Sequence, residues 1–281
     1  MEEVGLDVIL NPFKRRLTKD ELLGLLPGVT GLIAGLETLD YEVMSQSQLK
    51  VISRCGAGMS NVDLEAAQKL GIAVRNTPDA PTNSVAELTL GSLLGLLRMI
   101  PQMDKDMHDG KWNKQTGYEL KGKKIGIVGF GRIGRRLAEL LEPFGVEIIF
   151  IDPFVKSDDG SWQVLDLEDA LPLVDVMTLH CSGEEIILGE NEFSKMKDGV
   201  FILNAARGAN ISEEALINAL DSGKVAGAWI DTFCDEPYNG RLKEYNQVIL
   251  TPHVGSYTLE GRRAMELQTV DNLIEAFREI K

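Results

Sequence analysis

This chain has few cysteines, no long apolar run and a shortage of positive charge. Its three cysteines, Cys55, Cys181 and Cys234, are odd in number and widely separated, which argues against a disulfide framework or a metal site. They predict free thiols in a reducing cytoplasm. No apolar run approaches the roughly 18 residues of a membrane-spanning helix. No basic region precedes an apolar one at the N-terminus, so we expect no signal peptide.

Positive charge is scarce, because 29 lysines and arginines face 43 acidic residues among 281, giving a formal net charge of −14. Such a surface disfavours nucleic acid and anionic membranes as partners. It would also repel a small anionic substrate at long range, so arginines within the site would have to capture one. The composition, 44% hydrophobic and 26% charged, is that of an ordinary globular protein long enough for two domains.

A glycine-rich turn is the most informative stretch. The apolar run 124–128 leads into Gly129, Gly131 and Gly134, and an amphipathic helix is predicted over 132–144. In this context the first glycine permits a tight turn, and the second lets a pyrophosphate approach the backbone. The third lets helix and strand pack closely. Free N–H groups at the start of the helix would then face the phosphates.

An acidic residue follows this turn near the expected distance. A second apolar run, 146–151, ends in Asp152, eighteen positions after Gly134. A carboxylate there accepts from a ribose 2′-hydroxyl and repels a 2′-phosphate, which predicts NAD rather than NADP. The alternative is a plain glycine turn with an ordinary acid at a strand end. The order of strand, turn, helix, strand and acid favours the dinucleotide site.

The chain alternates predicted strands and helices, which indicates an α/β fold with doubly wound parallel sheets. Thr18 and Glu21 have capping-box spacing at the first helix, and two prolines within 76–81 predict a hinge. Strands are predicted at 6–10, 31–34, 49–53, 71–74, 124–129, 146–151, 175–180, 200–204, 225–231 and 247–251. Helices are predicted at 17–26, 64–70, 84–99, 132–144, 166–171, 190–197, 212–221 and 260–279.

Two further stretches each leave two interpretations open. The predicted helix 84–99 is apolar nearly all round, so either a homodimer partner or the core of a large domain must cover it. The loop Gly56-Ala57-Gly58 follows a predicted strand and Arg54. Its backbone amides could hold an anion, or it could be a plain turn.

Three polar clusters follow late predicted strands, at the end where ligands bind in parallel sheets, and they contain Arg207, Glu236 and His253. An arginine can hold a carboxylate with two hydrogen bonds, and a histidine is the natural proton donor near neutral pH. Each residue alone is more simply a surface ion-pair partner, a solvated acid or a structural histidine. Their combination in a dinucleotide fold favours a catalytic set. His180, at another strand end, would line the cofactor cleft.

These motifs resemble the D-isomer-specific 2-hydroxyacid dehydrogenases, most closely the D-3-phosphoglycerate dehydrogenase branch. The resemblance implies a Rossmann NAD-binding domain, 79–258, inserted in a smaller flavodoxin-like substrate domain, 1–78 plus 259–281. It also implies a homodimer through the NAD domain and an NAD-dependent enzyme for a small D-2-hydroxy acid or 2-oxo acid, with 3-phosphoglycerate among the candidates. The matching pieces are 54–63, 76–78, 84–88, 108–112, 120–134 and the three late clusters.

By this resemblance Arg207, Glu236 and His253 are catalytic. Substrate binding is assigned to Arg54, Gly56, Ala57, Gly58, Arg207 and His253. Cofactor contacts are assigned to Gly129, Gly131, Arg132, Ile133, Gly134, Asp152, His180, Cys181, Ala205, Ala206, Arg207, Asp231, His253 and Gly255. In this assignment Asp231 faces the nicotinamide carboxamide. No metal is implied.

The sequence departs from the family pattern in two places. The loop after His180 is shorter than usual, and the family's first strand and helix have no counterpart, so we expect the first domain to lack them. We also expect no regulatory extension of the kind that some phosphoglycerate dehydrogenases carry after the position of Lys281. The alternative to an enzyme is a non-catalytic, NAD-sensing scaffold of the corepressor type, because those corepressors have a similar fold. Oxidation of NADH by 2-oxo acids would distinguish the two.

Overall fold

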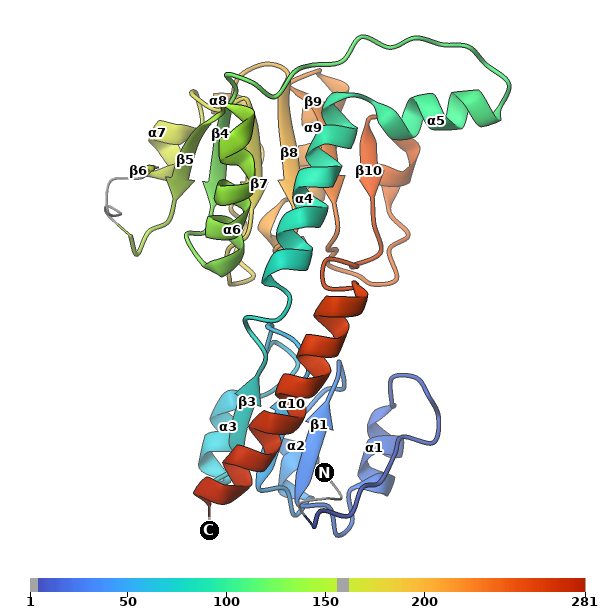
Figure 1. Ribbon diagram of the computed structural model, residues 1–281, viewed down its shortest axis with the longest axis vertical. Coiled ribbons are helices and arrows are strands. Elements are labelled where there is room, and N and C mark those ends of the chain that lie inside the picture. Colours follow the sequence, from blue (N-terminus) through green and yellow to red (C-terminus); the bar gives the residue numbers. More distant parts are fainter. Residues whose placement is uncertain (1–4, 156–161, 281) are drawn as a thin grey trace. The chain divides into compact units, whose positions relative to one another are not determined.

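The computed structural model describes residues 5–155 and 162–280, which divide into two compact units. The first unit comprises residues 1–81 and 256–281, and the second comprises residues 82–255 (Figure 1). Residues 1–4 and 281 of the expected substrate domain lie outside the described part. Each unit contains one parallel sheet with helices packed on it, so the predicted α/β fold with two parallel sheets is confirmed.

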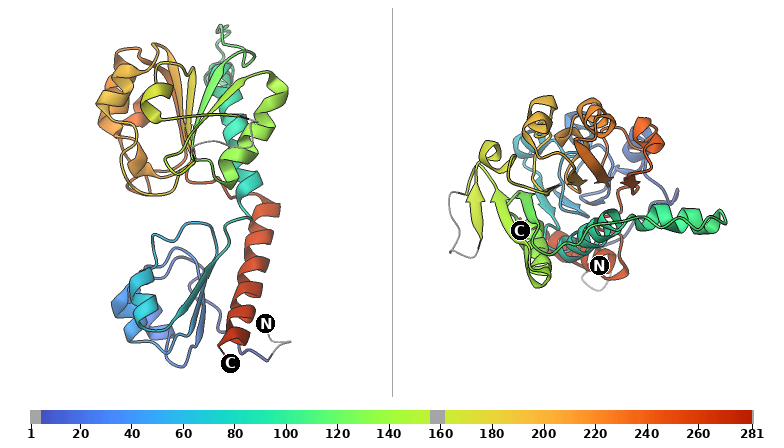
Figure 2. Two further views of the ribbon diagram at one scale, coloured as in Figure 1. Left: turned by 90° about the vertical axis from the view of Figure 1, so that its left-hand side faces the viewer. Right: turned by 90° about the horizontal axis from the view of Figure 1, so that it is seen from above.

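The first unit has a three-stranded parallel sheet in the order β1-β2-β3. Its strands are β1 (Gly31–Ala34), β2 (Val51–Arg54) and β3 (Ala73–Asn76). Its helices are α1 (Lys19–Leu25), α2 (Tyr41–Ser45), α3 (Leu64–Lys69) and α10 (Leu259–Glu279). Helix α10 covers one face of the sheet, where Val51 packs with Leu273 and Ala276. A second apolar core, which includes Leu22 and Ile52, lies beneath α1, α2 and α3 on the other face (Figure 2).

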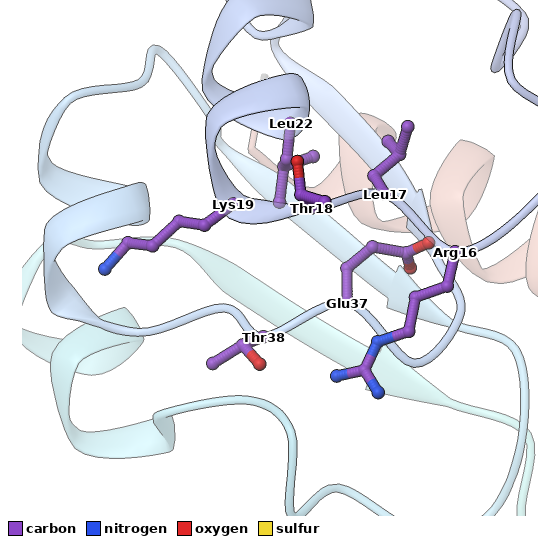
Figure 3. Close-up of a pocket in the computed structure, with 7 residues that line it drawn as sticks. All are labelled: Arg16, Leu17, Thr18, Lys19, Leu22, Glu37 and Thr38. Atoms are coloured by element: carbon purple, nitrogen blue, oxygen red, sulfur yellow. The ribbon is translucent and has the colours of Figure 1, made fainter. Parts of the chain in front are cut away.

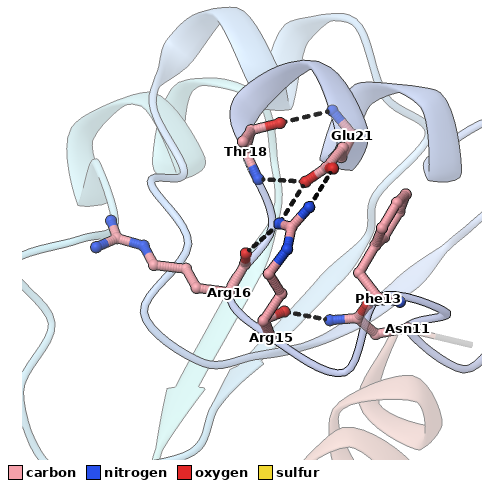
Figure 4. A network of polar contacts seen from close by, with 6 residues as sticks. All are labelled: Asn11, Phe13, Arg15, Arg16, Thr18 and Glu21. Carbon is pink, nitrogen blue, oxygen red and sulfur yellow. Dashed lines mark hydrogen bonds and ion pairs between the residues drawn. The ribbon is translucent and has the colours of Figure 1, made fainter.

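Helix α1 begins at the predicted capping box (Figure 4). Thr18 Oγ1 accepts from Glu21 N at 3.3 Å, and Glu21 Oε2 accepts from Thr18 N at 2.9 Å. Arg15 donates two further hydrogen bonds, of 2.7 and 2.9 Å, to the Glu21 carboxylate. The Arg15 bonds, followed by that from Thr18, lower the pKa of Glu21 to about 2. The cap therefore keeps its charge at neutral pH. Side chains close in sequence fix this helix start, which is why the sequence could locate it.

The predicted strand at 6–10 does not form. Among the described residues β1 is paired on one side only, with β2, and no strand lies beside the 6–10 segment. Ile9 and Leu10 are 65% and 79% exposed. A strand needs a neighbour for its N–H and C=O groups, so apolar character alone did not suffice here.

The second unit has a seven-stranded parallel sheet in the order β10-β9-β8-β7-β4-β5-β6. The chain runs outward from β4 to β6, then returns to β7 on the other side of β4 and continues to β10. The carboxyl ends of β4 and β7 therefore form the switch point where ligands bind in such sheets. The strands are β4 (Lys124–Val128), β5 (Glu147–Ile151), β6 (Gln163–Leu165), β7 (Val176–Leu179), β8 (Val200–Asn204), β9 (Val225–Ile230) and β10 (Val248–Leu250).

Helices cover both faces of this sheet (Figure 2). On one face, Leu93 and Leu97 of α4 and Leu137 of α6 share a core with the fully buried Trp229. On the other, α7, α8 and α9 pack over a second core. The helices are α4 (Thr82–Leu97), α5 (Ile100–His108), α6 (Arg132–Leu141), α7 (Leu167–Ala170), α8 (Glu190–Lys195) and α9 (Glu213–Asp221). Short 3₁₀ turns are η2 (Glu142–Phe144), η3 (Gly208–Asn210) and η4 (Arg241–Glu244).

Helix α4 is the predicted all-round apolar helix. Its Val85, Leu93 and Leu97 are buried within its own unit, so the domain core supplies part of its cover. Helix α5 bends away from it by 65°. Across the described residues no single helix has the length and apolar character of a membrane span, and α4 with α5 meets that test only as a bent pair, by length and composition.

Candidate active site

The three glycines between β4 and α6 have different surroundings. Gly129 has a φ of +106°, and a Cβ on it would lie 2.8 Å from the backbone of His180 and Cys181. A Cβ on Gly134 would lie 2.2 Å from the carbonyl oxygen of Gly129. Around a Cβ on Gly131, no atom of the described residues lies within 4 Å. The turn is closed at the first and third glycines and open at the second, which fits the approach of a pyrophosphate.

Asp152 follows β5, and its carboxylate is tied to the same turn. Asp152 Oδ2 accepts from Phe130 N, and Oδ1 accepts from Phe154 N, both at 2.9 Å. The residue is half-buried, so its carboxylate is held in place and remains partly open to solvent. Arg132 and Ile133 form the first turn of α6 beside it, the arginine exposed and the isoleucine half-buried.

Strand β7 leads into two uncharged side chains. His180 Nε2 lies 2.9 Å from the Thr178 hydroxyl, while its Nδ1 is buried without a hydrogen-bond partner in the described part of the chain. Burial lowers the pKa of His180 to about 3, so the ring is neutral near pH 7. Burial also raises the pKa of the neighbouring Cys181 thiol. An uncharged surface beside the glycine turn fits a nicotinamide ring better than a phosphate.

Asn204, at the end of β8, shapes the loop that carries Arg207. Asn204 Nδ2 donates to Arg207 O at 2.8 Å, and its Oδ1 accepts from Ala206 N at 3.0 Å. Arg207 N donates to Asn210 Oδ1 at 3.0 Å, so side-chain amides hold the Arg207 backbone on both sides. The half-buried guanidinium donates to Ala206 O at 2.7 Å. Ala205 lies between Asn204 and this loop, and it is partly buried.

The structure brings Glu236 and His253 together from the loops that follow β9 and β10. His253 Nδ1 lies 3.0 Å from each oxygen of the Glu236 carboxylate, and Phe233 N donates to Glu236 Oε1 at 3.1 Å. The side chains of His253 and Glu236 are 49% and 38% exposed. Because Nδ1 faces the carboxylate, Nε2 is the ring atom left to exchange a proton with a substrate. His253 has a φ of +53°, which is uncommon for a residue other than glycine.

Asp231, only 1% exposed, holds the loop that carries His253. Its Oδ1 accepts from the Thr251 hydroxyl at 2.5 Å and from Val254 N at 2.9 Å. Its Oδ2 accepts from Gly255 N at 2.9 Å. Both carboxylate oxygens therefore serve the protein's own backbone and a hydroxyl. The contact with a nicotinamide carboxamide expected for Asp231 stays a prediction.

The expected carboxylate loop lies after β2 in the first unit. Gly56 has a φ of +137°, and its N–H donates to Thr77 Oγ1 at 2.7 Å. The Arg54 side chain folds against it, because a Cβ on Gly56 would lie 1.5 Å from Arg54 Nη1. Ala57 is exposed and Gly58 is partly buried. The loop is therefore held from beneath, while its tip is open to solvent.

A hollow of about 350 Å³ lies elsewhere in the first unit (Figure 3). It is lined by Arg16, Leu17, Thr18, Lys19, Leu22, Glu37 and Thr38, none of which belongs to the expected site. Lys19 Nζ is already paired with the carboxylates of Asp40 and Glu42, at 2.7 and 2.5 Å. Within the described ranges, no group of histidine, cysteine or acidic side chains could hold a metal ion.

Three residues that support the site were not predicted: Asn204, Asn210 and Thr251. Asn204 and Thr251 open two of the polar clusters, so their position at a strand end was a usable signal. Asn210 had none, because its amide donates to carbonyl groups 27 and 25 residues earlier in the chain.

Residues 90–255 match the family described as D-isomer specific 2-hydroxyacid dehydrogenase, NAD binding domain. The chain belongs to the D-isomer specific 2-hydroxyacid dehydrogenase family. The matched region covers most of the second unit and includes the glycine turn, so NAD is the cofactor. The resemblance inferred from the sequence motifs is thereby confirmed.

Individual members of the family are similar over most of this chain. Human D-3-phosphoglycerate dehydrogenase is 40% identical over 273 residues, which are 93% of this chain and 51% of the human protein. This chain thus spans about half the length of the phosphoglycerate dehydrogenases it matches first. Hydroxypyruvate reductase of Thermotoga maritima is 37% identical over 92% of this chain and 88% of its own length.

The fold is also similar to that of solved structures. A glyoxylate reductase from Paecilomyes thermophila has a TM-score of 0.87 at 32% identity, covering 93% of this chain and 86% of that one. A protein from Thermus thermophilus has a TM-score of 0.93 at 34% identity, covering 99% of this chain and 92% of that one.

Proposed function

We propose that this chain is an NAD-dependent oxidoreductase that interconverts a small D-2-hydroxy acid and its 2-oxo acid. The observation that carries the proposal is the Glu236–His253 pair, with Nδ1 at 3.0 Å from the carboxylate. The pair and Arg207 follow the three adjacent strands β10, β9 and β8 of the NAD-binding unit. The expected proton donor and the arginine that would bind the substrate carboxylate therefore lie at the same carboxyl-terminal end of one parallel sheet.

The residues divide the chemistry of reduction between them. NADH, when bound, would be the source of the hydride that reduces the carbonyl carbon of the 2-oxo acid. Arg207 would hold the substrate carboxylate and stabilise the negative charge that grows on the carbonyl oxygen. His253 would deliver a proton from Nε2 to that oxygen, while Glu236 orients the ring through Nδ1. In oxidation His253 would accept the hydroxyl proton instead.

The arginines of the first unit bear on the choice of acid. A phosphorylated substrate needs a further cationic group. Arg75 Nη2 is bound to Glu279 at 2.6 Å, and Arg54 Nη1 donates to Cys55 O at 3.0 Å. Both arginines are already engaged, which favours an unphosphorylated acid such as glyoxylate or hydroxypyruvate over 3-phosphohydroxypyruvate. Two similar proteins bear names that refer to those two acids.

The test is oxidation of NADH in the presence of glyoxylate, hydroxypyruvate and 3-phosphohydroxypyruvate. We expect turnover with at least one acid, and a higher kcat/KM with the first two. A higher kcat/KM with the phosphorylated acid would move the substrate assignment to the phosphoglycerate branch. NADH binding without turnover of any acid would overturn the enzyme and favour an NAD-sensing scaffold. The three free cysteines fit a reducing compartment such as the cytoplasm.

A further inference from the structure

Asn210 occupies a buried position between two loops of the candidate site. It is 1% exposed, and every hydrogen-bonding position of its side chain is used. Its Oδ1 accepts from Arg207 N at 3.0 Å and from Cys181 Sγ at 3.8 Å. Its Nδ2 donates to Gly183 O at 3.1 Å and to Glu185 O at 2.9 Å. One planar amide thus joins the Arg207 loop to the loop after β7.

The backbone around Asn210 reinforces this connection. Asn210 O accepts from Ile187 N at 2.9 Å and from Leu188 N at 3.0 Å. Leu188 also forms an isolated parallel bridge with Ile211. The loop after β7 is the one expected from the family resemblance to be short. It is nevertheless fixed at several points that lie at or beside Asn210.

The Arg207 loop is confined on its other side as well. A Cβ on Gly208 would lie 2.1 Å from Phe233 C and 2.2 Å from Cys234 N. The backbone at Gly208 therefore lies directly against the loop that carries Glu236. With one side in contact and the other held by Asn210, the Arg207 backbone has little room to shift.

We propose that Asn210 is a positioning residue that fixes Arg207 relative to the His180–Cys181 segment, which follows β7. Its catalytic consequence rests on the proposed function. Because the Asn210 amide has partners in both loops, neither loop can shift without breaking hydrogen bonds that involve the other. Asn210 would thereby keep the Arg207 guanidinium, which is expected to bind the substrate, at a fixed distance from His180 and Cys181, which are expected to contact the nicotinamide.

The first test is Asn210→Ala, which leaves Arg207 N and the carbonyls of Gly183 and Glu185 without the amide. We expect kcat/KM for the 2-oxo acid to fall by about tenfold or more, because small misplacements of a catalytic group are costly. The matched control is Asp175→Ala at the amino end of β7, where Asp175 Oδ2 accepts from Lys124 N at 2.8 Å. The control should lower the melting temperature without changing kcat/KM.

Asn210→Asp gives a readout that a merely structural role would not. The aspartate keeps an acceptor for Arg207 N but loses both donors, and as a carboxylate it would repel the carbonyls of Gly183 and Glu185. A protonated carboxyl can donate to one of them. The kcat/KM of this variant relative to wild type should therefore rise as the pH is lowered from about 8 to about 6, since burial disfavours the charged form. A ratio that does not change with pH would count against the proposal.

A measurement independent of turnover tests the role of Asn210 separately from the proposed enzymatic function. Alkylation of Cys181 by iodoacetamide, followed by peptide mass spectrometry, should be faster in Asn210→Ala, because loop 181–185 loses its attachment. Cys55, in the other unit, should react at an unchanged rate. Absence of turnover in the wild type would defeat the proposed function yet leave this test intact. Unchanged Cys181 labelling and unchanged kcat/KM in a less stable Asn210→Ala would show a structural role only and overturn the inference.

Discussion

Several polar side chains of the candidate site bind the protein's own backbone rather than face solvent. Asp231 accepts from the N–H groups of Val254 and Gly255, and Asn204 donates to Arg207 O. Loops after parallel strands lack the ladder partners of the strands, so side chains must satisfy their backbone groups. The consequence is a rigid frame. His253 and Glu236 can then remain partly exposed without being disordered, which is the arrangement a preorganised catalytic pair requires.

Replacing the proton donor gives the most direct prediction. His253→Ala should lower kcat for the 2-oxo acid by about 10²-fold, the usual contribution of a general acid. Glu236→Gln keeps a partner for Nδ1 but removes the charge that stabilises a proton-carrying ring, so it should have a smaller effect on kcat. The dissociation constant of NADH, measured by fluorescence, serves as the internal control and should stay within twofold, or about 0.4 kcal/mol. Near-normal turnover in His253→Ala would require another donor.

Asp152 should set the choice between the two nicotinamide cofactors. Its carboxylate is fixed by Phe130 N and Phe154 N at 2.9 Å, so it cannot turn away from a 2′-phosphate without losing both bonds. We expect NADPH to bind at least about tenfold more weakly than NADH, since close like charges near a surface cost on the order of 1–4 kcal/mol.

Asp152→Asn should narrow this difference in affinity. Asp198→Asn makes the same charge change on the 90% exposed Asp198 at the other end of the sheet, and it should leave the ratio unchanged. Equal affinities for NADH and NADPH in the wild type would remove Asp152 from this role.

At the scale of elements, a helix or strand was predicted best where the residues that determine it all lie within one stretch of the sequence. The strands of the large sheet are apolar on both faces because helices cover both, and their runs were recognisable in the sequence. Strand formation at 6–10 depends on a neighbour that no local pattern reveals. β6 was missed because it is three residues long at the sheet edge, and α2 because it is only five residues long.

The candidate site shows the same division. Glycine spacing and strand ends located Gly129, Asp152 and Arg207, because each motif carries its chemistry within a few residues. Asn210 could not be found this way, since the partners of its side chain other than Arg207 come from a different loop. Nor could the burial of His180 Nδ1, because it depends on segments such as Gly129 that are distant in the sequence.

The carboxyl end of β7 should make stability depend on pH. His180 has a pKa lowered to about 3 by burial, against an ordinary value of 6.5. In the unfolded chain His180 therefore binds a proton near pH 6.5, whereas in the folded chain it binds one only near pH 3. Stability from this group is complete above pH 6.5 and falls, as the pH drops towards 3, by up to about 1.4 kcal/mol per pH unit.

Urea unfolding near pH 7 and pH 5 would measure this effect. His180→Gln, whose amide can still meet Thr178, should lose less stability between the two pH values than the wild type does. His108→Gln, a change in a ring that is 79% exposed on α5, should behave as the wild type. Identical losses in His180→Gln and wild type would mean that the buried ring does not resist protonation.

At the scale of the whole chain, apolar surface is unevenly distributed over the NAD-binding unit. Helix α4 is partly covered by the core of its own unit, whereas α5 and the segment after it extend beyond the sheet (Figure 1). Ile100 and Met107 are each 53% exposed, Trp112 is 76% exposed and Tyr118 is 49% exposed. Exposed apolar side chains of this size are typical of an association surface, although the net charge of −14 by itself favours separate chains.

We therefore expect a homodimer through the second unit, with α5 and residues 109–118 contributing more to the interface than α4. Light scattering at micromolar concentration should give twice the chain mass of 30.9 kDa. Met107→Lys with Trp112→Lys should yield monomers, because two charges would have to be buried in the interface. Leu267→Lys, on the 58% exposed Leu267 of α10, provides the control and should stay dimeric. A wild-type monomer, or a dimer that survives the double change, would show that this surface is not the interface.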